Sequence, residues 1–280
     1  MKGVLYEEEG VASAVGAILA ILIFIFLLSI YVTSYVPAEM TSYEEQYSSS
    51  LMDEIMQFAS SVNSMSVNYQ QGETVSVTFD LQSGYIPLFS SPTLGELTLS
   101  GATNRSNGFI EVNNTKMSVT SGGALTVLTN NRYFVDEAVV YEFSSLYYEQ
   151  YGSSPLINST LAFNLMQVNP PTNGTINLSM DLVDMQGGTL STSSGSPFDL
   201  TATALSKNIY KMDGNFTLTL SSSFGTQIFK SLQDRFSYLK GVALSLVNEG
   251  NGSDEIFIRS PSTISLTVSV LTVMIGLNGS

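Results

Sequence analysis

The sequence predicts a mainly β fold: a long N-terminal hydrophobic α-helix followed by a β-sandwich-like ectodomain of one or two β-modules. Three observations predict it. No charged residue occurs between Glu9 and Glu39. After about Asn68, apolar residues recur at every second position, which is typical of half-buried strands. Stretches rich in Gly, Ser, Asn and Pro separate these alternating runs, as turns would.

The N-terminal helix contains a segment long enough to cross a membrane. Val11 to Val36 reads VASAVGAILAILIFIFLLSIYVTSYV, about 26 residues or roughly 39 Å of helix. A bilayer core of about 30 Å needs about 20 apolar residues. Tyr31 and Tyr35 stand near its end, where aromatic rings favour the membrane interface. We therefore expect a membrane helix.

Three kinds of targeting segment compete for this stretch. A secretory signal peptide fits poorly, because the apolar core is long, the preceding MKGVLYEEEG is acidic, and SYVPAEM is a poor cleavage site. A plain signal anchor fits the length, although Lys2 beside Glu7, Glu8 and Glu9 gives little positive-inside bias. The third is a class III signal, cut on the cytoplasmic side before the apolar core.

The helix is expected to continue beyond the apolar segment, with one apolar face. Steps of three and four residues separate Met40, Tyr43, Tyr47, Leu51, Ile55, Phe58 and Val62. Pro37 should kink the helix where it leaves the membrane. The pattern predicts one long helix over residues 11–66 that is apolar at its start and amphipathic at its end.

This N-terminal region resembles that of the archaeal type IV pilin-like proteins, which include pilins and archaellins. Their short polar leader precedes a mature start similar to AVSxVIGxIL; here Glu7-Glu8-Glu9-Gly10 precedes VASAVGAIL, residues 11–19. The resemblance implies a leader over residues 1–10 and a prepilin peptidase cut between Gly10 and Val11. It also implies a mature helix that packs in a filament core or stays in the membrane. The segment GYIPLFSSPTLGELTL, residues 84–99, also resembles part of large archaeal pilin-like surface proteins.

Two departures from the wider family pattern occur in the same region. Val15 stands at the fifth mature position, where bacterial-type pilins carry Glu and archaeal members commonly do not. The usual Lys or Arg next to the cut is absent, and Lys2 is the base that precedes it.

Alternating runs predict many short strands after the helix. They begin with Val75, Val77, Phe79 and Leu81. The others span residues 97–99, 109–112, 125–127, 161–168, 176–182, 200–205, 216–220 and 256–258. We expect a first β-rich module over residues 68–145 and a second over 155–280, with the seam at Tyr141 to Pro155. We interpret the tyrosines of that seam as half-buried rings packed in the β-body. The alternative interpretation is a binding patch.

Two later segments need separate interpretations. Phe224, Ile228, Phe229, Leu232, Phe236 and Leu239 follow helical spacing and predict a helix packed on a sheet. At the C-terminus, Ile264 to Val270 alternates in one phase and Leu271 to Leu277 in the other. Its many β-branched residues favour a long strand with a bulge near Val270 over a second membrane helix.

Composition excludes several classes of function. The chain has no Cys and no His, so disulfides, thiolate metal sites and a Ser-His-Asp triad are impossible. A net charge of −14 argues against binding nucleic acid. The acid pairs Asp136-Glu137 and Asp254-Glu255 are interpreted as solvated turn charges, and no phosphate-binding loop is present. We expect no catalytic, cofactor-binding or metal site, and therefore no enzyme.

The body carries several acceptor motifs for N-glycosylation, and all of them follow the membrane helix. They are Asn104, Asn113, Asn158, Asn173, Asn177, Asn215, Asn251 and Asn278. Their position agrees with a body outside the cytoplasm, either at the cell membrane or in an extracellular filament.

Together these features predict a pilin-like cell-surface structural protein with an exterior β-rich body for adhesion or assembly. Its expected partners are the membrane, prepilin peptidase, and copies of itself or other pilin-like subunits met through the helix. The alternative is a signal-anchored receptor or ligand-binding ectodomain.

Overall fold

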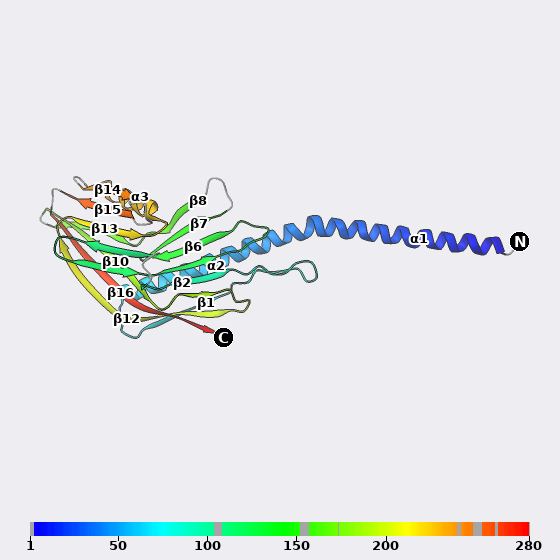
Figure 1. Ribbon diagram of the computed structural model, residues 1–280, viewed down its shortest axis with the longest axis horizontal. Helices are drawn as coiled ribbons and strands as arrows, with labels where there is room; N and C mark the ends of the chain where they lie inside the picture. Colours follow the sequence, from blue (N-terminus) through cyan, green and yellow to red (C-terminus); the bar gives the residue numbers. More distant parts are fainter. Residues whose placement is uncertain are drawn as a thin grey trace.

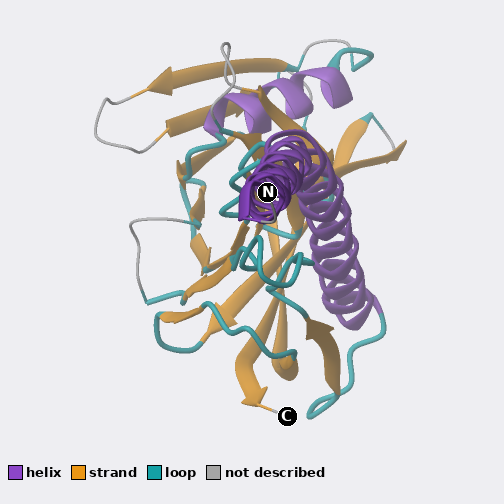
Figure 2. Cartoon of the chain, turned by 90° about the vertical axis from the view of Figure 1, so that its right-hand side faces the viewer, coloured by secondary structure: helices purple, strands orange, loops and turns teal. Residues whose placement is uncertain are grey.

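The computed structural model describes residues 3–103, 108–151, 157–172, 174–239, 242–248, 254–260 and 263–279. One long helical rod projects from a β-rich body, which confirms the expected fold class (Figure 1). The rod consists of α1 (Gly3–Ile30), the π-helical turn η1 (Tyr31–Tyr35) and α2 (Val36–Val67). Figure 2, which looks along the rod from its N-terminal end, shows its second half lying beside the strands.

The π-helical turn lies just before Pro37. Proline has no backbone N–H, and its ring crowds the carbonyl four residues earlier. The wider turn absorbs this change, and the N–H of Val36 donates to the Tyr31 carbonyl five residues back. The axis of the rod changes direction here (Figure 1). The kink expected at Pro37 is therefore present, on its N-terminal side.

Three sheets make up the described part of the body. The first has the order β1 (Thr74–Phe79), β12 (Phe198–Asp213), β16 (Ile264–Gly279), β10 (Thr175–Gln186), β9 (Met166–Thr172). The second has the order β11 (Leu190–Thr192), β2 (Glu96–Ser100), β5 (Ala124–Leu128), β6 (Glu137–Glu142), β7 (Ser145–Gln150), β8 (Ile157–Ala162). The third has the order β14 (Ala243–Asn248), β15 (Asp254–Arg259), β13 (Phe216–Ser221), β3 (Phe109–Asn113), β4 (Ser118–Gly122). Strands β10 and β16 pair in parallel, and the other described pairs are antiparallel.

Two hydrophobic cores fill the body. The first lies among α2, the second sheet and one end of the first sheet, and includes Phe58, Phe79, Leu125 and Val273. The second lies among the third sheet, α3 (Gly225–Phe236) and the other end of the first sheet. The predicted late helix is thus confirmed, with Ile228, Leu232 and Phe236 buried in the second core.

The long strand β16 takes part in both cores. Its even-numbered residues Ile264 to Val270 face the second core, whereas Leu271, Val273 and Ile275 face the first. Successive side chains of a strand point to opposite faces. The change of phase at Val270 therefore marks the place where the covered face changes.

The expected long C-terminal strand is confirmed, but its expected bulge near Val270 is wrong. Pairing between β16 and β10 continues without a shift through that position. The irregularity lies on β12, at Leu205, where Ala204 pairs with Val273 and Ser206 with Thr272. The sequence of β16 could not show this, because a change of covered face and a bulge give the same hydrophobic pattern.

The two modules expected over residues 68–145 and 155–280 are not separate. β1 pairs with β12, β2 with β11, and β3 with β13, so each sheet contains strands from both stretches. The expected seam runs through paired strands, since β6, β7 and β8 are neighbours in one sheet. Sheet pairing joins residues far apart in sequence, which local patterns do not report.

The single strand expected over residues 161–168 is also wrong. β8 ends at Ala162 and β9 begins at Met166. Between them, the hydroxyl oxygen of Ser145 accepts hydrogen bonds from the N–H groups of Asn164 (3.1 Å) and Leu165 (3.2 Å). β9 continues through Pro170 and Pro171, although proline was expected in the stretches that separate strands. It is an edge strand, where a missing N–H is tolerated.

Candidate functional site

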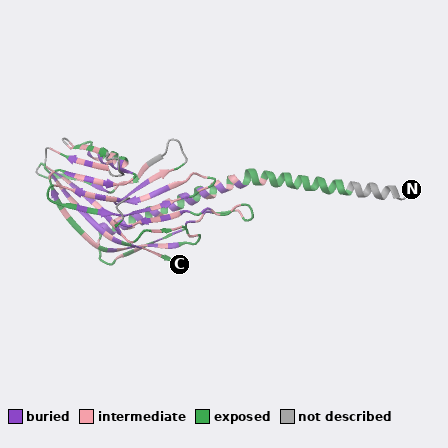
Figure 3. Ribbon diagram, in the orientation of Figure 1, coloured by how far each residue is buried: buried purple, intermediate pink, exposed green. Residues whose placement is uncertain are grey.

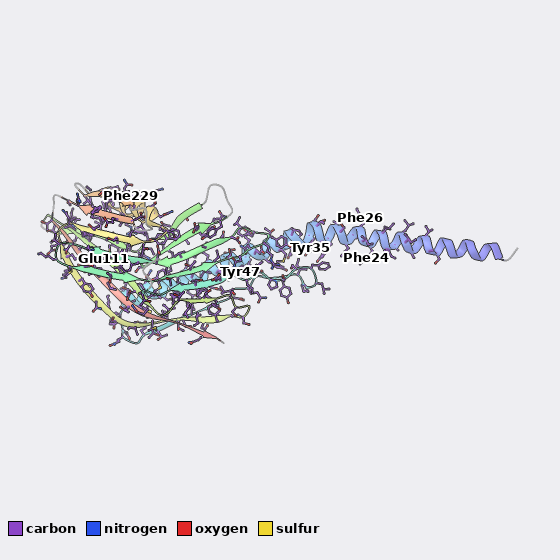
Figure 4. The ribbon with its side chains drawn as sticks, in the orientation of Figure 1. Phe24, Phe26, Tyr35, Tyr47, Glu111 and Phe229 are labelled. Atoms are coloured by element: carbon purple, nitrogen blue, oxygen red, sulfur yellow. The ribbon has the colours of Figure 1, made fainter. Side chains whose placement is uncertain are left out.

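The N-terminal half of the rod is not covered by the rest of the chain. Every residue from Ser13 to Ile30 is exposed, including Phe24 at 65% (Figure 3). Figure 4 shows Phe24 and Phe26 on a part of the rod that the body does not reach. By length and composition this helix can cross a membrane, and none of its most apolar window is buried.

Such an apolar surface is unfavourable in water. Each Leu, Ile or Phe side chain gains about 1.5–3 kcal/mol when it is fully removed from water. Ile18, Leu22, Phe24, Ile25 and Phe26 are all more than half exposed. Lipid chains or the apolar helices of neighbouring molecules would each cover this surface.

The second half of the rod is buried on one face. Tyr47, Leu51, Ile55, Phe58 and Val62 of the expected apolar face lie in the first core. The Tyr47 hydroxyl also donates to the carbonyl of Leu81 (3.1 Å). Figure 4 places Tyr47 inside the body. The rod and the body are therefore firmly joined.

A buried carboxylate fixes the rod to the loop between β5 and β6. Glu44 is 0% exposed and accepts hydrogen bonds from three consecutive backbone N–H groups. These belong to Arg132 (3.0 and 3.1 Å), Tyr133 (2.6 Å) and Phe134 (2.8 Å). Such charge-assisted bonds are among the stronger ones in proteins.

Sequence reasoning missed Glu44, although a signal was present. Glu44 lies four residues after Met40 and three before Tyr47, on the apolar face of the helix. A carboxylate on a buried face requires hydrogen-bond donors from elsewhere in the fold. The position of Glu44 could have predicted a clamp, but not which loop it holds.

Two loops surround the rod where the covered half begins; we call them the collar. One is residues 83–93 between β1 and β2, and the other is residues 129–136 between β5 and β6. The first extends along the rod towards the N-terminus (Figure 1). Its Phe89 ring meets the Tyr31 ring edge to face, with centroids 5.0 Å apart, and Tyr31 stacks on Tyr35 at 4.9 Å. An Arg132 guanidinium N–H donates to the Ser91 hydroxyl (3.0 Å) and so links the two loops.

The expected seam has two tyrosines buried in the body, Tyr141 and Tyr147, and one that is half-buried, Tyr148, whereas Tyr151 is 38% exposed. The Tyr141 hydroxyl donates to the Asn63 amide oxygen on α2 (2.7 Å). The Tyr148 hydroxyl donates to Glu137 (2.6 Å). Burial raises the pKa of Tyr141 well above its ordinary value.

Several carboxylates of the body accept hydrogen bonds from other residues of the fold. Asp136 accepts from the N–H of Asn131 (2.6 Å), and Glu137 accepts from Tyr148, so this pair is bound within the fold. Among the described residues, no three His, Cys, Asp or Glu side chains gather where they could hold a metal ion. Burial raises the pKa of Glu142 from 4.5 to about 7, partly offset by the Ser222 hydroxyl that donates to it.

The glycosylation candidates differ in their surroundings. Asn215 and Asn278 are exposed, and Asn113 is half-buried beside Asn215 in a groove of about 370 Å³. Asn177 is half-buried, and its amide donates to the Pro170 carbonyl (3.0 Å) and the Thr172 hydroxyl (3.1 Å). Candidates outside the residues described at side-chain level are Asn104, Asn158, Asn173 and Asn251.

The expected processing site lies within the rod. Gly10 and Val11 both belong to the backbone of α1, which begins at Gly3. Their side-chain surroundings lie outside the described part.

The chain matches none of the known proteins with which it was compared. No family model matches its sequence, no curated protein is significantly similar, and no solved structure shares its fold significantly.

Proposed function

We propose that this protein is a type IV pilin-like structural component of the cell surface. Its N-terminal helix anchors it in the membrane or joins it to other subunits, and its β-rich body serves adhesion or assembly outside the cell. One observation carries the proposal: a continuous helix has one half buried in its own body and the other half apolar and uncovered. The resemblance of residues 7–19 to class III signals supports the same function.

The fold suits a rigid spacer. The Glu44 clamp and the buried face of α2 hold the rod against the body, so a force on the rod reaches the first core. The uncovered half lies in lipid before assembly and against neighbouring rods in an assembly. Either environment removes its apolar surface from water. Exposed Asn215 and Asn278 are suitable carriers of glycans on the exterior.

Sequencing the N-terminus of the mature protein tests the processing step. We expect a start at Val11, produced by prepilin peptidase. A Gly10→Phe variant should keep its leader, because a bulky residue replaces the small one before the cut. Gly3→Phe, within the same leader, is the matched control and should be processed normally. An intact Met1 in the native protein would favour a plain signal-anchored receptor instead.

Cross-linking tests whether the rods assemble. The chain has no cysteine, so Phe24→Cys introduces a single thiol on the uncovered rod. In a filament this residue meets neighbouring rods, and oxidation should join pairs of subunits into disulfide-linked dimers, because each subunit offers one thiol. Gly188→Cys, on an exposed turn with free space around it, is the control and should give little cross-linking. A full-length chain that stays monomeric and soluble without detergent would overturn the proposal.

A further inference from the structure

The loop of residues 83–93 has an apolar surface with no partner in the body. No charged residue occurs between Asp80 and Glu96. Leu88 is 100% exposed, Tyr85 50% and Phe89 41%. These three residues lie in or next to the turn at residues 87–89, which we call the tip. The loop extends along the rod away from the main part of the body (Figure 1). A soluble surface loop normally carries polar residues there.

Leu88 occupies an unusual backbone conformation for its type. Its φ is 71°, in the left-handed region that favours glycine and asparagine. Glycine would relieve this strain, and a polar side chain would suit full exposure to water. Leucine therefore suits neither this backbone conformation nor full exposure to water.

The loop is held in place. At its neck, the N–H of Ser83 donates to the Thr93 carbonyl (3.0 Å), and the N–H of Thr93 donates to the Ser83 hydroxyl (2.9 Å). Across the tip, the N–H of Ile86 donates to the Ser90 hydroxyl (2.8 Å). Gly84 lies against the Tyr43 ring, where an added Cβ would come within 2.9 Å. The exposed side chains are therefore presented on a fixed support.

The tip also lies at a defined level on the rod. The last acid before the apolar segment is Glu9. A bilayer core of about 30 Å takes up about 20 residues of helix, which ends near Ile30 when counted from Val11. The next residue, Tyr31, is the one that contacts the Phe89 ring. The loop thus meets the rod where the hydrocarbon would give way to the head groups.

We propose that this tip inserts into the outer interface of the lipid bilayer that the rod crosses. The inference rests on the membrane-anchored form of the proposed function. Tyr35 on the rod and Tyr133 on the collar are also partly exposed and add aromatic rings at the same end of the body. Aromatic and aliphatic side chains without charges are what this layer accepts. The rod and the loop then form two contacts with the membrane, which fix the orientation of the body.

The absence of tryptophan from the chain gives a direct test. Leu88→Trp places one fluorophore at the tip of the full-length protein, which is reconstituted in phosphatidylcholine vesicles. Lipids brominated near the glycerol end of the acyl chain should quench this tryptophan and those brominated near the methyl end should quench it less. Its emission should also shift to shorter wavelength. Tyr85→Trp repeats the test with a conservative aromatic exchange.

Two control positions separate this inference from the proposed function. Phe24→Trp should be quenched best by bromine deep in the bilayer, and Tyr238→Trp, 68% exposed after α3, should not be quenched. If Phe24→Trp is quenched and both loop probes are not, the anchor stands and the inserted loop is overturned. If neither the Phe24→Trp probe nor the loop probes are quenched, the membrane anchor and the inserted loop are both overturned. Emission at shorter wavelength without quenching would mean that a neighbouring subunit covers the tip, which also overturns the inference.

Discussion

The two halves of the rod share one helix but have opposite surroundings. From Ser13 to Ile30 every residue is exposed, although nearly all are apolar. From Val36 to Val67 the helix carries polar residues on one side, and its other side is buried against the first core. The body of this chain covers one face of α2, whereas it leaves residues Ser13 to Ile30 of α1 uncovered.

This difference predicts that the stability of the body depends on the covered half of the rod, and that the anchoring proposed above depends on the uncovered half. Changes in the covered half should alter the unfolding of the body, and changes in the uncovered half should alter only its association with lipid or other subunits. Four predictions test this separation.

The largest contrast is between two phenylalanines. Phe58→Ala should lower the free energy of unfolding by about 3–5 kcal/mol, because it leaves a cavity in the first core. Phe24→Ala should change that free energy by less than about 0.5 kcal/mol, because this side chain has no neighbour in the body. Urea denaturation of the body in mild detergent measures both values. Equal losses of unfolding free energy in the two variants would show that the two halves of the rod do not act independently.

Dependence on pH should be confined to the body. Burial raises the pKa of Glu142 to about 7 in the folded protein, against 4.5 ordinarily. The folded state then binds the Glu142 proton more tightly than the unfolded state does. The stability that this proton contributes is therefore fully present below pH 4.5 and is lost as the pH rises through about 7. A shift of this size corresponds to about 3 kcal/mol.

Denaturation across that pH range checks the effect. Glu142→Gln should remove most of the dependence. The pKa of Glu54 is also raised to about 7, but this residue is only half-buried, so Glu54→Gln should remove less. Residues Ser13 to Ile30 contain no ionisable group, and their partition into vesicles should not change. A Glu142→Gln protein that keeps the full pH dependence would contradict this assignment.

The Glu44 clamp should have an intermediate effect. Glu44→Gln puts an amide where an oxygen accepts from Tyr133 and Phe134 N–H groups, and should cost about 2 kcal/mol of stability. Exchange of those backbone hydrogens should become faster. Glu45→Gln, one residue on and exposed, should be nearly neutral. If the two variants behave alike, the clamp does not contribute as described.

The smallest effect concerns one hydrogen bond between α2 and β6. Tyr141→Phe removes the donor to Asn63 but keeps the buried ring, and should cost about 1 kcal/mol. Thermal unfolding in detergent measures the loss, and Tyr238→Phe on the exposed surface serves as the control. An unchanged Tyr141→Phe protein would mean that ring packing alone joins these elements.

Several elements were predictable from local patterns, and others were not. The rod, the apolar face of α2 and the late helix follow from helical spacing, and most strands follow from alternation. The break at Asn164 depends on Ser145, which is 19 residues earlier in the chain. The collar was missed because its loops meet only when β1, β2, β5 and β6 are in place.

The sequence by itself determined that one long apolar helix precedes a β-rich body, because charge and hydrophobic periodicity act over a few neighbouring residues. Only the tertiary structure decided which strands pair, that β16 faces two cores, and that Glu44 and Phe89 bring two distant loops onto the rod. These contacts join residues far apart in the chain. Their energy depends on where the backbone places them, and no local pattern carries that information.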